Sequence, residues 1–155
     1  MHHHPPLAIR YATEHDATVV ARLDRAVLGS SERETLLHRA VAAGECVVAE
    51  RGAALVGLAT MDQSFYGRCF LSLLIVHREY RRRGVGSALI AYLERHCPGD
   101  DLFTSTNASN LPMRRLCERL RFVESGRIEN LDPGDPEIVY YKRLHAPINP
   151  LPERE

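Results

Sequence analysis

One stretch of the chain, residues 71–90, constrains the fold more than any other. It begins with a continuously apolar run, Leu71–Val76, and passes through a turn rich in arginine and glycine, Arg81–Gly86. From Val85 onward, apolar residues recur at helical spacing as far as His96. This order predicts a buried strand, a tight turn and an amphipathic helix. Because a helix N-terminus exposes unpaired backbone amides, the neighbouring arginines indicate an anion-binding site.

The segments on either side of this stretch show strand-like and helix-like patterns. Strands are expected from apolar and β-branched runs at 7–11, 46–50, 54–61, 70–76, 102–105, 122–128 and 138–144. Helices are expected from apolar spacing at 13–28, 31–44, 85–96 and 111–120. The first helix begins at Thr13 with Asp16, and the second at a capping box formed by Ser31 and Glu34. We expect residues 51–53 to form a hairpin turn and the segment 63–68 to form a polar loop.

This order of elements predicts an α/β fold with a mixed central sheet flanked by helices on both faces. Segment 70–76 belongs at the centre, because a continuously apolar strand is usually covered on both faces. Each of the last two helices is expected to join parallel, neighbouring strands through a crossover. The 155 residues suffice for one domain with its own core. We assign 7–145 to that domain, 1–6 to a tag-like or disordered start and 146–155 to an irregular tail.

Composition narrows the classes of partner. The 20 basic and 20 acidic residues give a formal net charge of zero, which argues against a general attraction to nucleic acid or to an anionic membrane. No apolar run approaches the ~20 residues needed to span a bilayer. Four cysteines without a CxxC pair and the absence of an apolar signal segment favour a reduced, cytoplasmic protein. His2–His4 could bind a metal, but a tag or a disordered end is the favoured interpretation, so we expect no metal site.

Three interpretations of the glycine turn can be compared on its residues. A phosphate-binding P-loop requires a lysine followed by Ser or Thr, and no lysine is present here. The dinucleotide fingerprint requires a small third residue where Leu89 stands. A solvated surface corner is a further alternative, and the residues of the turn by themselves leave it open. What remains is Arg81-x-x-Gly84-x-Gly86 after a buried strand, in which glycines allow close approach of an anion and arginines supply countercharge.

This pattern resembles the acetyl-CoA signature of the GCN5-related N-acetyltransferase (GNAT) superfamily. The signature is Arg or Gln, two residues, Gly, one residue, then Gly or Ala, after a strand that ends in a step like Leu74-Ile75-Val76 and an approach like Tyr80-Arg81. The segment 107–122 is similar to the family's second CoA-facing segment. In order and spacing the resemblance covers roughly residues 7–144. It implies the family's mixed sheet, acetyl-CoA as cosubstrate and an amine as acceptor.

The resemblance also implies which residues contact the cofactor. The strand backbone at Leu74, Ile75 and Val76 is expected to pair with the pantetheine arm of CoA. The turn is expected to hold the pyrophosphate through Arg81, Arg82, Arg83, Gly84, Val85, Gly86 and Ser87. Asn107 and Asn110 are expected beside the CoA, although both are also helix-capping residue types.

Two catalytic positions depart from the family pattern. Cys117 stands where the family often has a tyrosine that protonates the leaving thiolate; it is either a weak acid or a small core residue. Ser72 stands on the strand where many members carry a glutamate base, and its hydroxyl could instead orient a water or bond to a neighbouring backbone group. Asp62, Glu137 and His77 are further candidates for the base, and the sequence does not rank them.

The sequence therefore predicts an N-acetyltransferase that moves an acetyl group from acetyl-CoA to a primary amine of a small molecule or a protein. An acyl-CoA-binding sensor or structural protein with little or no catalytic turnover is the alternative, favoured by the absent tyrosine and glutamate. A nucleic-acid-binding role for the arginine run is less favoured, because no aromatic residues are interleaved with it. The acceptor and the oligomeric state stay open, with a homodimer as one option.

Overall fold

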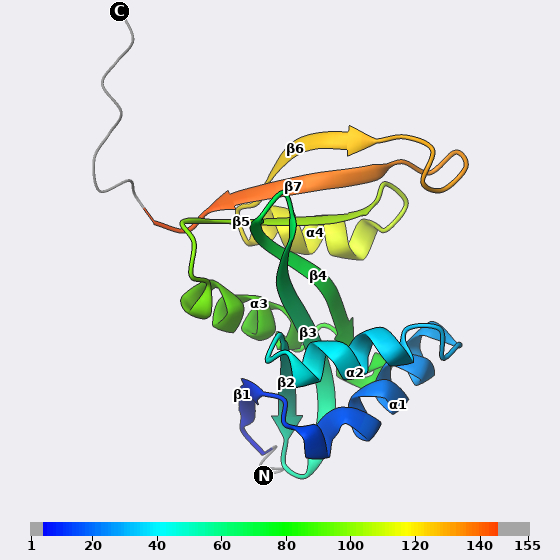
Figure 1. Ribbon diagram of the computed structural model, residues 1–155, viewed down its shortest axis with the longest axis vertical. Helices are drawn as coiled ribbons and strands as arrows, with labels where there is room; N and C mark the ends of the chain where they lie inside the picture. The colour runs from blue at the N-terminus through cyan, green and yellow to red at the C-terminus, as the bar shows by residue number, and fades with distance from the viewer. Residues whose placement is uncertain (1–4, 146–155) are drawn as a thin grey trace, which may run out of the picture.

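The computed structural model describes residues 5–145, so the expectations for His2–His4 and for the tail from residue 146 lie outside the described residues. A seven-stranded sheet has the order β1-β2-β3-β4-β5-β7-β6 (Figure 1). The strands are β1 Leu7–Tyr11, β2 Cys46–Arg51, β3 Ala54–Phe65, β4 Arg68–Val76, β5 Asp101–Asn107, β6 Val123–Ile128 and β7 Glu137–Arg143. The helices are α1 Ala17–Leu28, α2 Glu34–Ala42, α3 Val85–His96 and α4 Leu111–Arg119. The predicted mixed sheet with helices and the central position of β4 are confirmed.

Helices cover both faces of the part of the sheet formed by β1 to β4. Along β2, alternate residues enter different cores: Val47 and Ala49 pack in the core with α3, and Val48 packs in the core with α1 and α2. Because successive strand residues point to opposite faces, α3 lies on one face of these strands and α1 with α2 on the other. Gly57 of β3 allows α3 to approach closely, since a Cβ there would lie 2.9 Å from Val85 Cγ1.

The sheet opens between β4 and β5. These strands run parallel, but they pair only at Phe70 with Phe103 and at Leu71 with Thr104. The buried hydroxyl of Thr104 donates to the Leu71 carbonyl at 2.9 Å and satisfies it where the pairing ends. The next residue, Ser72, is an extra residue in β4, because Thr60 pairs with Leu73 and Met61 pairs with Leu71. This β-bulge marks the point from which β4 and β5 separate.

The structure corrects three sequence expectations. Residues 63–65 extend β3, and Phe65 pairs with Arg68, so the predicted polar loop at 63–68 is a hairpin with Tyr66 and Gly67 at its tip. Both tip residues have positive φ, which suits a two-residue turn between twisted strands. The second helix begins at Glu34 rather than at a Ser31 capping box.

The third correction concerns the last helical crossover. β5 and β6 are not neighbours, because β7 lies between them and pairs antiparallel with both. The chain returns from β6 through its turn-rich loop and inserts β7 beside β5. The parallel neighbours expected across α4 were therefore wrong, whereas those expected across α3, β4 and β5, are confirmed.

Candidate active site

The arginine and glycine turn joins the end of β4 to the start of α3. Gly84 is the N-cap of α3 and has φ +78°, a conformation that costs L residues with a side chain about 1–2 kcal/mol. Arg82 also has positive φ, +60°, so the turn holds backbone strain that a functional loop often carries. Arg81, Arg82 and Arg83 are all exposed. The turn thus presents three cations beside the first amides of a helix, an arrangement that favours a phosphate group.

Gly86 lies in the first turn of α3 and brings that turn close to two other elements. A Cβ at this position would lie 3.3 Å from Leu116 Cδ2 of α4 and 3.6 Å from Leu74 Cδ2 of β4. The start of α3 is therefore seated between the free half of β4 and α4. The site residues expected at 74–76 and 81–87 are brought together by this contact.

Among residues 5–145, the second half of β4, from Leu73 to Val76, has a strand neighbour on one side only. It pairs with β3 at residues 57–60, whereas its pairing with β5 ends at Leu71. Backbone amides and carbonyls of a strand point alternately to its two sides. This half of β4 therefore offers an open edge next to the start of α3, on which an extended ligand can pair as an added strand.

The bulge at Ser72 places a polar pair at the N-terminal end of this open edge, next to Leu73. The Ser72 hydroxyl lies 2.7 Å from the Thr60 hydroxyl and 3.3 Å from the Thr60 carbonyl. Thr60 is buried and Ser72 is exposed. The pair holds an exposed hydroxyl in a fixed position, which suits a group that binds a water or a substrate atom.

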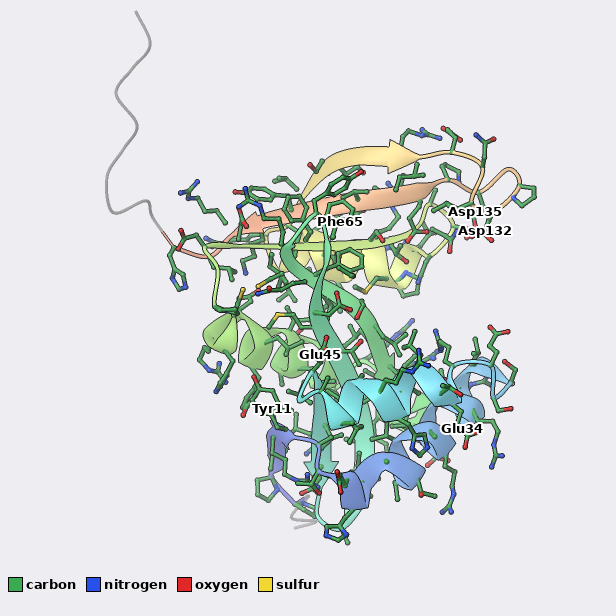
Figure 2. The ribbon with its side chains drawn as sticks, in the orientation of Figure 1. Tyr11, Glu34, Glu45, Phe65, Asp132 and Asp135 are labelled. Carbon is green, nitrogen blue, oxygen red and sulfur yellow. The ribbon has the colours of Figure 1, made fainter. Side chains whose placement is uncertain are left out.

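A cleft of about 370 Å³ lies between α2 and this part of the sheet. Its lining includes the predicted residues Ser72 and Asp62 together with Glu45 and Arg39. Glu45 follows α2 and lies beside β3, where its carbonyl accepts from the Met61 amide at 3.0 Å (Figure 2). Sequence reasoning missed Glu45, because its place beside Ser72 depends on the path of the chain after α2. The cleft combines two carboxylates, a hydroxyl pair and arginine, so it suits a cationic or zwitterionic molecule.

A larger hollow of about 500 Å³ lies at the other end of β4, between Arg68, Cys69 and the loop that enters β5. Neither Ser72 nor the glycine turn lines it. The smaller cleft is therefore the better candidate for a reaction site, because it alone adjoins the bulge.

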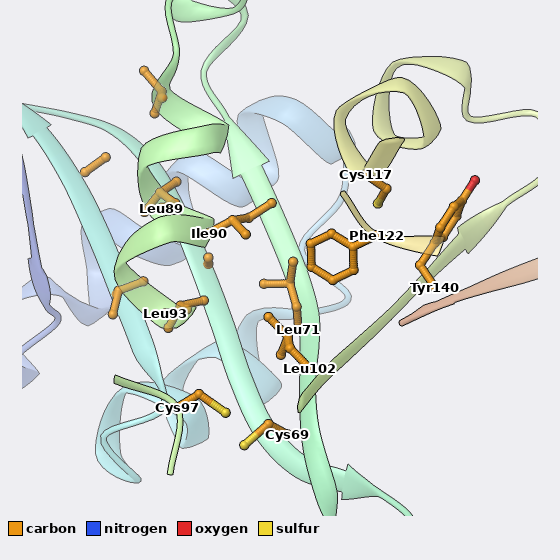
Figure 3. Packing of buried hydrophobic residues seen from close by; sticks show 14 of the residues in the cluster. Cys69, Leu71, Leu89, Ile90, Leu93, Cys97, Leu102, Cys117, Phe122 and Tyr140 are labelled. Atoms are coloured by element: carbon orange, nitrogen blue, oxygen red, sulfur yellow. The ribbon is translucent and has the colours of Figure 1, made fainter. Parts of the chain in front are cut away.

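Cys117 lies inside the protein core, packed in the same cluster as Phe122 and Tyr140 (Figure 3). Its exposed fraction is 0%. Burial raises the pKa of its thiol to about 12. A buried thiol of this kind is a poor proton donor to a ligand, so the placement favours the packing role over the acid role, which stays a prediction.

The two asparagines expected at the cofactor have partners within the protein. Asn110 is the N-cap of α4, where its side-chain oxygen accepts from the Met113 amide at 3.3 Å. The amide group of Asn107 donates to the Asp132 carboxylate at 2.7 Å and so ties down the loop between β6 and β7. Their cofactor role stays a prediction.

The two remaining candidates for the base, His77 and Glu137, do not line the cleft. His77 caps a 3₁₀ turn, where its Nδ1 accepts from the Glu79 amide at 3.1 Å. Of the bases considered from the sequence, only Asp62 lies in the cleft with Ser72.

The open strand edge lies beside the glycine-capped helix N-terminus, and solved structures of similar fold are acetyltransferases. The chain superposes on an acetyltransferase of the GNAT family from Bacillus cereus with a TM-score of 0.86 and 35% identity, covering 89% of this chain and 97% of that one. It is similar to the acetyltransferase YncA from Salmonella typhimurium, solved with its cofactor acetyl-CoA, with a TM-score of 0.73, 17% identity and coverage of 94% and 98%.

A third similar structure is the ribosomal-protein-S18-alanine N-acetyltransferase from Escherichia coli, with a TM-score of 0.76, 18% identity and coverage of 94% and 99%. The sequence model of the acetyltransferase (GNAT) family matches residues 14–122, which is more than half of the chain. The chain belongs to the GNAT family of acetyltransferases. A search of curated proteins gave no match.

Two further properties concern residues 5–145. No helix in this range is long and apolar enough to cross a membrane. Within the same range, no group of three or more His, Cys, Asp or Glu side chains is arranged to hold a metal ion.

Proposed function

We propose that this protein transfers an acetyl group from acetyl-CoA to a primary amine. The observation that carries the proposal is the open edge of β4 from Leu73 to Val76, which lies directly beside the first turn of α3. An extended arm with a pyrophosphate at one end fits this pair of features. The amides of 74–76 would pair with the arm, and the turn 81–87 would bind the phosphates through backbone amides and arginines.

The bulge is the proposed position of the thioester. Pairing between β4 and β5 stops at Leu71, so amides near Ser72 are available to stabilise an oxyanion on the thioester carbonyl. The acceptor nitrogen attacks that carbonyl; the C–N bond forms, the C–S bond breaks and the thiolate leaves. The ammonium loses two protons in total, one to the thiolate and one to solvent, so the products are the acetamide, CoA thiol and one released proton.

Residues of the cleft can accept the first proton. An ammonium with a pKa near ~10 must be deprotonated before it attacks. Glu45 and Asp62 line the same cleft as Ser72, so either carboxylate can accept the proton through a water held by the Ser72 hydroxyl. Positioning supplies most of the rate in such a direct transfer, because the cofactor on β4 and the acceptor in the adjoining cleft are held next to each other.

The test combines binding with turnover. Calorimetry with acetyl-CoA should give saturable binding, and a panel of primary amines should release CoA thiol. Glu45→Gln and Asp62→Asn should each be compared for kcat and for acetyl-CoA binding; the proposed base lowers kcat at unchanged acetyl-CoA affinity. Binding without release for any amine would instead identify an acyl-CoA-binding protein, and absence of binding would overturn the proposal.

A further inference from the structure

A row of side chains crosses four strands on the face of the sheet that carries the cleft. Asp62 of β3 pairs with Phe70 of β4, Phe70 pairs with Phe103 of β5, and Phe103 pairs with Tyr141 of β7. Directly paired residues project from the same face of a sheet. These four side chains therefore stand side by side, over a span of about 14 Å for three strand spacings.

This face is opposite to the one covered by α4. The neighbour of Tyr141, Tyr140, is buried on the other face, and its hydroxyl accepts from Arg114 of α4 at 3.0 Å. Alternation along β7 then turns Tyr141 away from α4. At the tip of the β3–β4 hairpin, Phe65 packs against Phe103 of β5 on this face (Figure 2).

The rings form a packed but half-exposed surface. Phe65 stacks on Phe70 with ring centres 5.2 Å apart and also lies 5.2 Å from Phe103. Phe103 lies 5.1 Å from Tyr141. All four rings keep part of their surface accessible to solvent. We call Phe65, Phe70, Phe103 and Tyr141 the aromatic wall. Mutual packing fixes its rings in place, so it can accept a flat apolar group at little entropic cost.

The aromatic wall continues the cleft at the reaction end. Asp62 belongs to both, because it lines the cleft and pairs with Phe70. Phe70 precedes Ser72 by two residues on β4, so the wall begins beside the bulge. A molecule with one end in the cleft can lay the rest of its length along the rings.

Charge decides which end of such a molecule enters the cleft. The Asp62 carboxylate accepts from the Ser64 amide and hydroxyl, neither of which neutralises it. Within residues 5–145, Glu45 and Asp62 have no ion-pair partner, whereas Arg33 of the same cleft is paired with Asp24. Arg39 also lines the cleft and has no ion-pair partner in this range, so two carboxylates face one arginine and are in excess. An excess of carboxylates favours an ammonium, and aromatic faces favour both cations and rings.

We infer that the acceptor is a small primary amine with an aromatic ring, whose ammonium lies by Asp62 and Ser72 and whose ring lies on the aromatic wall. This inference rests on the proposed function for its chemistry, which is the same acetyl transfer with the same proton balance. It adds the class of acceptor and assigns Phe103 and Tyr141 to its recognition.

The experiment compares matched amines and matched variants. With saturating acetyl-CoA, CoA release should give kcat/KM at least about tenfold higher for 2-phenylethylamine than for propylamine, since a well-packed apolar group is worth about that factor. Phe103→Leu should reduce the value for 2-phenylethylamine about tenfold and the value for propylamine less than about twofold. Tyr11→Leu, at a partly exposed aromatic residue of β1, should change neither.

A binding measurement keeps this inference separate from the proposed function. Calorimetry of 2-phenylethylamine with the CoA-bound protein should give saturable binding that Phe103→Leu weakens about tenfold. Such binding without CoA release would sustain the aromatic recognition and overturn the transfer reaction. No binding, equal kcat/KM for the two amines, or preference for a peptide N-terminus over both amines would overturn the inference.

Discussion

The two parts of the sheet are covered differently. Strands β1 to β4 are packed between α3 on one face and α1 with α2 on the other. Strands β5, β7 and β6 have α4 on one face (Figure 1). On the other face, Phe103 of β5 and Tyr141 of β7 contribute to the aromatic wall. β4 belongs to both parts, and its pairing with β5 stops after Leu71. A doubly covered half provides a rigid frame, whereas a half with one open face leaves side chains available to a substrate.

This difference separates cofactor binding from acceptor recognition within the proposed active site. The free edge of β4 belongs to the doubly covered half, and the turn at Gly84 joins this strand to α3. Asp62 and the aromatic wall lie where cover is lost. Substitutions in the first half should therefore change stability or cofactor binding, and those on the wall should change acceptor choice.

The largest effect, on stability, is expected at the ion pair between α1 and the start of α2, the helices that cover one face of the doubly covered half. Asp24 of α1 is 1% exposed and accepts from Arg33 Nε at 3.2 Å, which ties α1 to the start of α2. Arg33→Met leaves this carboxylate buried without its cation and should lower the free energy of unfolding by about 3–5 kcal/mol. The melting temperature should fall by about 10 °C. Arg25→Met, at an exposed arginine of α1, is the control and should change it little.

The next effect concerns the cofactor turn, and two glycines allow a matched comparison. Gly84 and Gly29 both have positive φ, +78° and +85°, and neither has an atom within 4 Å of an added Cβ. Alanine should therefore strain both sites by a similar ~1–2 kcal/mol. Only Gly84→Ala shifts the start of α3, so it alone should weaken acetyl-CoA binding, by at least about tenfold. Equal affinities of the two variants in calorimetry would remove the turn from the proposed cofactor site.

Local sequence patterns predicted the doubly covered half and the turn at Gly84. They did not predict the cleft or the aromatic wall. Continuous apolarity predicted the central place of β4, and glycine spacing predicted the turn at Gly84, because both signals lie within a few neighbouring residues. The insertion of β7 beside β5 depends on long-range pairing that no single segment encodes. The bulge at Ser72 and the pairing of Phe70 with Phe103 depend on register in the same way. The position of Glu45 in the cleft likewise depends on the path that the chain takes after α2, which no local pattern predicts.

A third prediction tests the frame through its pH dependence. Arg10 of β1 donates to Asp16 at 2.7 Å and also pairs with Glu50 of β2. The Arg10 hydrogen bonds hold the pKa of Asp16 well below its usual range. A depressed carboxyl pKa stabilises the fold above the unfolded value near ~4, and this contribution is lost as the pH falls below it.

Asp16→Asn should therefore be less stable than the wild type by about 1–2 kcal/mol at pH 7, a modest amount because Arg10 is partly exposed. The gap should narrow between about pH 4 and pH 2. Urea unfolding across this range measures it, with Glu14→Gln, at an exposed neighbour, as the control. A constant gap at every pH would assign the loss to packing and not to the charge of Asp16.

The smallest effect is expected at Cys117, where the two halves meet at α4. The thiol is fully buried beside Phe122, so removal of one sulfur in Cys117→Ala should lower the free energy of unfolding by about 1 kcal/mol. If Cys117 is only a packing residue, Cys117→Ala should have the same kcat as the wild type between pH 6 and 9. A thiol with a pKa of about 12 does not titrate in that range. A tenfold or greater fall in kcat, with acetyl-CoA affinity unchanged, would instead establish Cys117 as the acid that protonates the leaving thiolate. A buried residue of α4 would then take part in the reaction. The division between a structural frame and a substrate-binding surface would no longer hold at α4.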